Sequence, residues 1–500
     1  MSAGDMLVTI DVGTSGARAA AFDLDGGLVG EARRSYPTMA PRPGWSEQDA
    51  RAWQSASLGA LGDLVRRLRT AGNGAPIRAI GLTGQCPSVV LVDGRGEPLG
   101  PGLIYRDNRA TTQAAAIRER LGDREIHRRT GHLPAAFHIA PKLIWLREHE
   151  PALFARARLA LQPRDLVARA LTGEVATDGT HAAATLVFDL GAGAWAADLL
   201  AGVDLAPDLF PPVRASTAVL GSLRSAFARR LGLGPVAVVL GGADSQACAL
   251  GAGVVEPGPV SEMAGSSTCL NAVVGAPLAE LLITHYPHVI PGSLTTETGI
   301  NTTGAAVAWV ADTFYARPGR PARAADFVRL DSEAGREPAG ARSVVALPVL
   351  ADGERTDPDL RGAFVGISLG AGRATLARAM LEGVAHEIRS HLDLLRRAGA
   401  PATELRVSGG DARLASWNRI KADILGIPVT RIASDAAAVG VAMLAGLGVG
   451  IYRDAAEAID RCVHPDVPIE PDPSTREVYE AGHAAYRSLV SSAAVRWREG

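Results

Sequence analysis

Residues 6–23 read Met6-Leu-Val-Thr-Ile-Asp-Val-Gly-Thr-Ser-Gly-Ala-Arg-Ala-Ala-Ala-Phe-Asp23 and are the part of the chain that indicates the fold most strongly. Residues 6–10 are apolar enough for a buried strand, residues 11–16 are turn formers, and residues 18–23 are a second, mostly apolar run. A further turn at Asp25-Gly-Gly27 leads into residues 28–31. The pattern therefore predicts three strands in a meander.

Outward from this stretch, strands alternate with helices. Residues 49–70 repeat apolar side chains at the helical period, with Asp49 as the expected N-cap, and 77–82 and 89–92 are strand-like. Such alternation predicts an α/β fold.

The same order of elements restarts near residue 235. A buried strand is expected at 235–240, and strands at 260–264 and 270–274 flank a second turn of small residues. The layout predicts domains at 1–243 and 244–500 and suggests an ancient duplication. Residues 317–341 are expected to form a surface excursion, 373–397 a long helix and 405–407 a strand.

Lysine is nearly absent from the chain. Of 51 Lys and Arg residues, only Lys142 and Lys421 are lysines, and they follow Pro141 and Ile420. Neither completes the Gly-Lys-Ser/Thr step of a Walker-type phosphate loop, so the common P-loop NTPases are excluded. We expect both lysines on helix surfaces, and their replacement by arginine to leave phosphoryl transfer largely intact.

Composition and charge point to a globular enzyme. Hydrophobic residues make up 47% of 500, enough to bury a large core over two domains. A net charge of -2 and a pI near 6.6 give no reason to expect nucleic acid or an acidic membrane as a partner. The longest uncharged run, 17 residues between Asp435 and Arg453, suits a buried helix better than a membrane span. Four scattered cysteines predict neither a disulfide framework nor a zinc knuckle, and a cytoplasmic location is expected.

Two turns of Gly, Ser and Thr could cradle phosphate. In Asp11-Val-Gly-Thr-Ser-Gly16, backbone N–H groups and hydroxyls can contact phosphate oxygens, and Asp11 is placed to hold Mg²⁺ or its waters. Gly265-Ser-Ser-Thr268 is a similar turn, and a nucleotide between the two would be clamped from both sides. The alternative for each is an ordinary hairpin turn.

Two Gly-Gly motifs follow buried strands. In Gly241-Gly-Ala-Asp244, the carboxylate of Asp244 could take the proton of an attacking hydroxyl during phosphoryl transfer. The alternative, a carboxylate that caps the next helix through Ser245 and Gln246, is compatible with that role. In Ser408-Gly-Gly-Asp411, two glycines would let a flat ring such as adenine approach the backbone.

In this order the four sites resemble those of the FGGY carbohydrate kinases, in particular their xylulokinase-like branch. The resemblance runs from about Leu7 to about Gly450. The motifs that carry it are Ile10-Asp-Val-Gly-Thr-Ser15, Ile80-Gly-Leu-Thr-Gly-Gln85, Tyr105-Arg-Asp107 with Arg109, Leu171-Thr-Gly-Glu-Val-Ala-Thr-Asp178, Gly241-Gly-Ala-Asp244, Gly353-Glu-Arg355 with Asp357-Pro358, Arg361-Gly-Ala-Phe-Val-Gly366, Ser408-Gly-Gly410, Trp417 and Ala422-Asp-Ile-Leu-Gly-Ile-Pro428.

The resemblance implies two ribonuclease H-like (actin/hexokinase/Hsp70-type) α/β domains with an interdomain cleft. Residues 1–243 would bind the sugar and the first phosphates, and residues 244–500 the nucleotide. It implies ATP-dependent, Mg²⁺-assisted phosphorylation of a small sugar, a ketose such as a pentulose or a polyol, at a primary hydroxyl. Dimers are common in the family, which leaves a homodimer open.

By matching position, the resemblance also implies a role for each site residue. The general base is Asp244; the metal residue is Asp11; Gly13, Thr14, Ser15, Gly265, Ser266, Ser267 and Gly304 line the phosphates and ribose; Gly409 and Gly410 face the adenine or its ribose; Gln85, Cys86, Asp107, Asp244 and Gln246 form the sugar site.

The chain departs from the family pattern mainly around the sugar. Cys86-Pro-Ser88 stands where the xylulokinase pattern has Met-His-Gly, Arg106 where it has Asn, and Ser245 where Asn is usual. These departures argue against xylulose as the substrate but not against sugar phosphorylation. Arg106 and Arg109 either hold the substrate or bridge to Asp107. Asp411, in place of a small residue, either alters base contacts or faces solvent.

Two alternative functions are kept open. One is an actin/Hsp70-like ATPase without a small acceptor. The other is a non-catalytic sugar-sensing relative.

Overall fold

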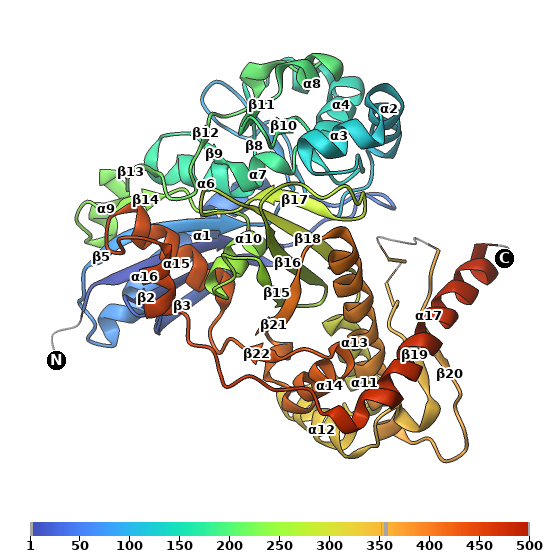
Figure 1. The fold of residues 1–500 in the computed structure, drawn as a ribbon. Coiled ribbons are helices and arrows are strands. Elements are labelled where there is room, and N and C mark those ends of the chain that lie inside the picture. Colours follow the sequence, from blue (N-terminus) through green and yellow to red (C-terminus); the bar gives the residue numbers. More distant parts are fainter. Residues whose placement is uncertain (1–3, 352, 355–358, 499–500) are drawn as a thin grey trace. The chain divides into compact units, whose positions relative to one another are not determined.

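The computed structural model describes residues 4–351, 353–354 and 359–498, with side chains up to residue 493 (Figure 1). Arg355, Asp357 and Pro358 of the motifs quoted above lie outside the described residues. The chain divides into two compact units, of which the first comprises Met1–Val255, Val274–Thr296 and Ala436–Val463. The second comprises Glu256–Val273, Glu297–Asp435 and His464–Gly500.

This division differs from the expected single boundary between residues 243 and 244. Asp244 belongs to the first unit, because the helix that it begins, α10 (Asp244–Gly251), packs on α15 (Ala436–Gly448). The chain returns to the first unit to supply α15, and a sequence read in order gives no sign of that return.

A mixed sheet organises the first unit. Its strand order is β13-β14-β5-β1-β2-β3. The predicted meander is confirmed as β1, β2 and β3, and β1 also pairs in parallel with β5, which pairs in parallel with β14. The bounds are β1 Met6–Val12, β2 Gly16–Asp23, β3 Leu28–Ser35, β5 Ile77–Gly84, β13 Val219–Ser222 and β14 Ala237–Val239.

Alternate residues of β5 face opposite sides of this sheet. Ile80 and Leu82 join the core beneath α1 (Ala50–Thr70), whereas a Cβ at Gly81 would lie 2.7 Å from the carbonyl of Val441 in α15. Glycine at this position therefore lets α15 approach the sheet closely. Helix α1 begins after Asp49, whose carboxylate accepts the N–H of Arg51 at 2.9 Å, so the predicted N-cap is confirmed.

The remaining elements of the first unit are mostly short. The helices are α2 Thr111–Leu121, α3 Asp123–Thr130, α4 Ile139–His149, α5 Pro151–Phe154, α6 Pro163–Thr172, α7 Gly179–Ala183, α8 Ala197–Gly202, α9 Ser225–Leu231 and α16 Ala455–Cys462. The paired short strands are β4 Glu47–Gln48 with β7 Gly102–Leu103, β6 Val90–Val92 with β8 Leu159–Leu161, β9 Thr177–Asp178 with β12 Val213–Arg214, and β10 Phe188–Asp189 with β11 Ala194–Trp195.

The second large sheet repeats the pairing pattern of the first. Its order is β17-β18-β16-β15-β21-β22, with β15 antiparallel to β16 and parallel to β21. That repeat agrees with the duplication inferred from the layout. The bounds are β15 Gly258–Ala264, β16 Thr268–Val274, β17 Thr284–Pro287, β18 Leu294–Ile300, β21 Ala402–Gly409 and β22 Val429–Arg431.

The helices of the second unit include one that the sequence did not predict. Residues 317–341 contain α12 (Ala324–Arg336), which buries Leu330 and Ala334 and whose Asp331 accepts the N–H groups of Ser416 and Trp417. Tertiary packing thus converts an expected surface excursion into a helix. The other elements are α11 Gly304–Phe314, α13 Arg373–Ala398, α14 Ala415–Leu425, α17 Arg476–Arg498 and the pair β19 Val345–Leu347 with β20 Ala363–Val365.

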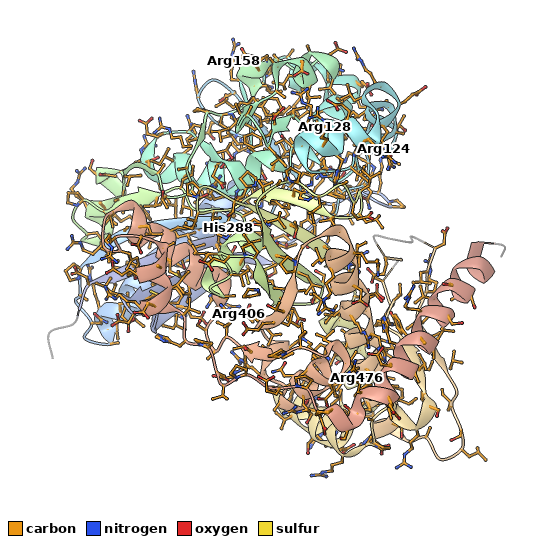
Figure 2. The ribbon with its side chains drawn as sticks, in the orientation of Figure 1. Arg124, Arg128, Arg158, His288, Arg406 and Arg476 are labelled. Carbon is orange, nitrogen blue, oxygen red and sulfur yellow. The ribbon has the colours of Figure 1, made fainter. Side chains whose placement is uncertain are left out.

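The expectation that both lysines lie on helix surfaces is wrong. Lys142 and Lys421 are fully buried, and arginines such as Arg124, Arg128 and Arg158 carry positive charge at the surface (Figure 2). The partners of each lysine are distant from it in the sequence. Within the described part of the chain, every helix is too short or too polar to cross a bilayer.

Candidate active site

The first half of the site forms where parallel strands of the first sheet end. Asp11, one residue before the end of β1, pairs with Thr83 of β5, and Val12 pairs with Gly84. Because β1, β5 and β14 are parallel, the residues that follow them emerge at the same edge. This edge therefore gathers the turn after Asp11, Gln85 and the loop that leads to Asp244.

The turn after Asp11 is held by hydrogen bonds to its carbonyls. Gly13 O accepts from the Tyr36 hydroxyl at 2.6 Å and from Gln85 Nε2 at 3.3 Å, and Thr14 O accepts from Gln48 Nε2 at 2.6 Å. Burial, together with the negative charge of Asp11, raises the pKa of Tyr36 well above its usual range. The Asp11 carboxylate thus lies close to the turn that we expect to hold phosphate.

The predicted sugar residues Gln85 and Asp107 are enclosed in the protein. Gln85 is 3% exposed, and its amide nitrogen also donates to Gln48 Oε1 at 2.9 Å. The Asp107 carboxylate is fully buried, accepts the N–H of Ser46 at 2.6 Å and pairs with Arg109 at 2.7 Å. Both side chains shape the loops around the site, and their contact with a sugar stays a prediction.

The structure decides between the two roles considered for Arg109. Its guanidinium bridges Asp107 and Glu47 and stacks 3.7 Å from the ring centroid of Trp45, so it bridges to the carboxylate. The neighbouring Arg106 instead donates to the hydroxyl of Tyr105 at 3.0 Å. Of the other predicted sugar residues, Cys86 is partly exposed, and Gln246 is buried.

Asp244 follows a tightly constrained loop. Gly241 has φ +71, and a Cβ there would lie 1.7 Å from Leu82 O, so only glycine fits. Gly242 O accepts from the Thr83 hydroxyl at 2.7 Å. Asp244 is the first residue of α10, with Ala243 at the N-cap position, and its carboxylate accepts the N–H of Ser245 at 2.8 Å, a contact that is compatible with a catalytic role.

In the second unit, the predicted nucleotide residues of three turns come together. Gly304 N–H donates to Gly265 O at 3.1 Å, and Thr303 N–H donates to Ser266 O at 3.1 Å, so the 265–268 turn is joined to the start of α11. A Cβ at Gly304 would lie 2.4 Å from both Gly265 O and Asp411 Oδ2, and one at Gly409 would lie 2.1 Å from Ala264 O. A Cβ at Gly410 would meet open space.

Asp411, the departure from the family pattern, packs against this cluster. Its Oδ2 is buried without a hydrogen-bond partner among the described residues, and burial raises the pKa of Asp411 to about 6. The alternative in which this side chain simply faces solvent is therefore wrong.

The residues present fit a magnesium-dependent reaction. Among the described residues, there is no group of three or more His, Cys, Asp or Glu side chains that could hold a metal on its own. Mg²⁺ in phosphoryl-transfer sites typically takes one or two carboxylates plus substrate phosphates and waters. Asp11, beside a turn suited to phosphate, meets that requirement.

Some residues that shape the site were missed from the sequence. Tyr36 and Gln48 hold the turn after Asp11, and Arg164, Asp178 and Thr180 surround the loop before Asp244. Asp178 is the last residue of one of the family motifs, so the sequence marked it as important but did not indicate what it does. The others act through partners that are distant in sequence.

Two ribonuclease H-like units, each with a Gly/Ser/Thr hairpin turn at the sheet edge, define the sugar-kinase class of this fold. The N-terminal domain of the FGGY family of carbohydrate kinases matches residues 6–251, and its C-terminal domain matches residues 261–449. The chain belongs to the FGGY family of carbohydrate kinases and is an ATP-dependent sugar kinase.

Its relatives include kinases of different substrates. A xylulose kinase of Escherichia coli (strain K12) is 29% identical over 498 residues, covering 97% of this chain and 98% of that protein. A glycerol kinase of Bordetella parapertussis is 32% identical over 474 residues, covering 90% of each. The crystal structure of xylulose kinase from Rhodospirillum rubrum matches with a TM-score of 0.88 at 30% identity, covering 99% of this chain and 100% of that one.

Proposed function

We propose that this kinase transfers the γ-phosphoryl group of ATP to a primary hydroxyl of a small ketose, such as a pentulose, or of a polyol, with Asp244 as the general base. The observation that carries this proposal is the placement of Asp244. Its carboxylate follows a constrained loop at the sheet edge where Asp11 and the phosphate turn also lie. A positioned carboxylate beside a phosphate turn is what phosphoryl transfer to an alcohol requires.

In this proposal each part of the site has a separate task. Asp244 accepts the proton of the sugar hydroxyl as that oxygen bonds to the γ-phosphorus and the bond to the leaving ADP breaks. Asp11 would hold a Mg²⁺ ion, which would neutralise phosphate charge. The turn at 13–15 contacts phosphate from the first unit. The turns at 265–267 and 409–410, with Gly304 at the start of α11, hold the phosphates, ribose and adenine in the second unit.

The acceptor is proposed to differ from xylulose. The relatives include both xylulose kinases and glycerol kinases, so identity over the whole chain does not choose the substrate. Cys86 and Arg106, in loops next to the site, and Ser245, at the start of α10, depart from the xylulokinase pattern. These three side chains support a related sugar of different shape or polarity.

The base assignment is tested with Asp244→Asn. Loss of a positioned proton acceptor is expected to lower sugar phosphorylation by about 10²–10⁴-fold, while ATP binding, measured by calorimetry, persists. The matched control is Asp25→Asn, whose carboxylate is 70% exposed and pairs with Arg461 at 2.8 Å. Near wild-type turnover of the Asp244 variant would contradict the assignment.

The acceptor is identified with a coupled ADP-release assay over pentuloses, hexuloses, tetritols and polyols. Release that depends on one sugar class supports the proposal. Release without any sugar favours the ATPase alternative, and sugar binding without release favours the non-catalytic alternative. Light scattering of the purified chain tests the homodimer.

A further inference from the structure

The loop before Asp244 is anchored by side chains from a segment about 60 residues earlier in the sequence. Ala243 N–H donates to the hydroxyl of Thr180 at 2.8 Å, and that hydroxyl also lies 2.6 Å from Asp178 Oδ2. A Cβ at Gly242 would lie 3.4 Å from the same hydroxyl oxygen. Thr180, near the start of α7, therefore contacts the main chain immediately before the proposed base.

Asp178 decides the direction of the hydrogen bonds at Thr180. Burial by itself would raise the pKa of Asp178, but the charge of Arg164 and the hydrogen bonds from His181 and Thr180 outweigh it and hold the pKa well below its usual range. An ionised carboxylate can only accept. The Thr180 hydroxyl must therefore donate to Asp178, and its lone pairs face the N–H of Ala243.

The other side of the same carboxylate holds the start of the loop. Arg164 Nη2 lies 3.1 Å from Asp178 Oδ1, and its Nη1 donates to Leu240 O at 2.9 Å and to Gly241 O at 3.1 Å. Arg164 and Asp178 are both fully buried. The Asp178 carboxylate thus orients both the Arg164 guanidinium, which donates to the carbonyls of residues 240 and 241, and the Thr180 hydroxyl, which accepts the N–H of residue 243.

We infer that Thr180 is a positioning residue for the kinase reaction: oriented by Asp178, its hydroxyl fixes the main chain before Asp244 and so aims the Asp244 carboxylate at the sugar hydroxyl. The inference rests on the proposed function, since it assumes that Asp244 is the base. A displacement of about 1 Å at a reacting group can cost about 10²-fold in rate.

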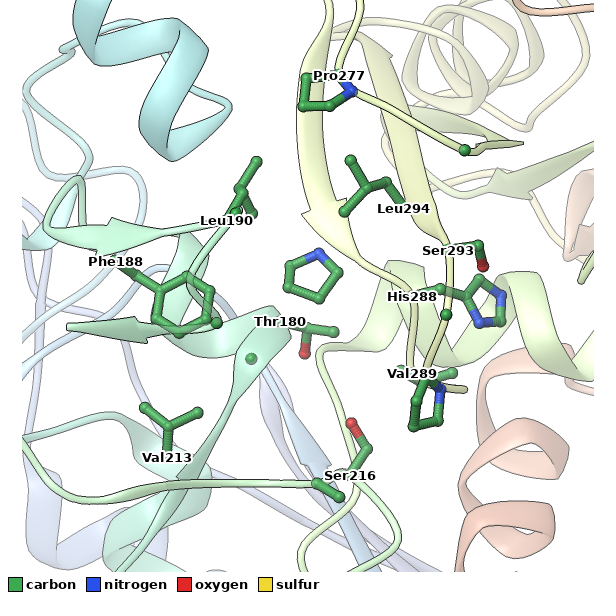
Figure 3. A pocket seen from close by; sticks show the side chains of 18 of the residues that line it. Thr180, Phe188, Leu190, Val213, Ser216, Pro277, His288, Val289, Ser293 and Leu294 are labelled. Carbon is green, nitrogen blue, oxygen red and sulfur yellow. The ribbon is translucent and has the colours of Figure 1, made fainter. Parts of the chain in front are cut away.

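The surroundings of Thr180 allow the orientation of Asp244 to be tested separately from the predicted substrate contacts. Thr180 and Ser216 lie on the wall of a cavity of about 570 Å³ in the first unit (Figure 3). Of the predicted sugar and nucleotide residues, none lines this cavity. A change at Thr180 can therefore alter the aim of Asp244 without removing a predicted substrate contact.

The test compares Thr180→Val, Thr180→Ser and Thr180→Cys in the full-length enzyme. Valine keeps the shape and removes the hydroxyl, so kcat for sugar phosphorylation is expected to fall about 10- to 100-fold, with KM for ATP and sugar within about threefold of wild type. Serine restores the hydroxyl and is expected to keep kcat within about threefold. Cysteine, a weak acceptor, should fall between them and gives the same reading where the valine variant does not fold.

The matched control is Thr185→Val. Thr185 is also buried, and its hydroxyl donates to Ala182 O at 2.6 Å and accepts the N–H of Val187 at 3.3 Å, with no bond to the Asp244 loop. This variant should lose thermal stability like Thr180→Val but keep kcat within about twofold.

The inference is overturned if Thr180→Val keeps kcat, if the valine variants at 180 and 185 lose activity equally, or if Thr180→Ser fails to restore it. Absence of sugar-dependent ADP release in the wild-type enzyme would instead overturn the proposed function itself.

Discussion

The buried pair of Lys421 and Glu262 gives the sharpest prediction about stability. Lys421 Nζ lies 2.8 Å from both carboxylate oxygens of Glu262, and the two side chains are 0% and 1% exposed. Nζ also lies 4.3 Å from the ring centroid of Trp417. Lys421→Met would leave the Glu262 carboxylate buried without its cation.

The expected size of the effect follows from that burial. Removing one partner of a buried pair typically costs about 3–5 kcal/mol, because the remaining charge is desolvated and uncompensated. For domains of about 150–250 residues, the size range of the second unit, 1 kcal/mol shifts the melting temperature by about 2–4 °C. Lys421→Met should therefore lower the melting temperature of the second unit by about 6–20 °C.

The double variant Glu262→Leu/Lys421→Met tests whether the loss of stability comes from the uncompensated charge of Glu262. Replacing both charges by apolar side chains is often neutral or stabilising, so the double variant should recover most of the loss. Calorimetry of the wild type, the two single variants and the double variant measures the melting transitions of both units. A Lys421→Met protein that melts within about 2 °C of wild type, or a double variant as unstable as the single one, would contradict this role of the buried pair.

Three further predictions concern the site and its pH dependence. Gly304→Ala should raise KM for ATP at least about tenfold, since its Cβ would overlap Gly265 O, whereas Gly72→Ala at an open turn should not; steady-state kinetics decides. Burial, and then the charge of Glu387, raises the pKa of Glu354 from 4.5 to about 7 despite a backbone hydrogen bond. The folded state therefore binds the proton more tightly, and about 3 kcal/mol of stability is lost as the pH rises from about 4.5 to 7; Glu354→Gln should remove this slope from melting curves. Lys142→Met should raise KM for the sugar but not for ATP, because Lys142 ties the carbonyls of residues 87 and 104 together in the loops beside Cys86 and Asp107.

The buried lysines also change an expectation drawn from the sequence. On a helix surface, arginine would replace either lysine without consequence. In a fully enclosed site, the larger planar guanidinium cannot reproduce the contacts of the compact ammonium group, so Lys→Arg is not conservative here. The double variant Lys142→Arg/Lys421→Arg is accordingly expected to lose stability, and its melting temperature in differential scanning calorimetry checks this.

Features that depend on residues close together in the chain could be predicted from the sequence alone. Hydrophobic period and turn chemistry were enough for the meander of β1 to β3, for α1 with its cap at Asp49, for the buried helix α15 and for the turns at 11–16 and 265–268. The order of these turns was enough to indicate the family. Each of these strands, helices and turns depends on residues close together in the chain, where side-chain spacing and backbone preference act together.

Features that depend on residues far apart in the chain became visible only in the folded protein. Lys421 meets Glu262 across 159 positions, and Thr180 meets Ala243 across 63. The return of the chain to the first unit at α15 placed Asp244 there. No periodicity records such pairings, because a buried charge or hydroxyl is stabilised by whichever group the fold brings within hydrogen-bond distance.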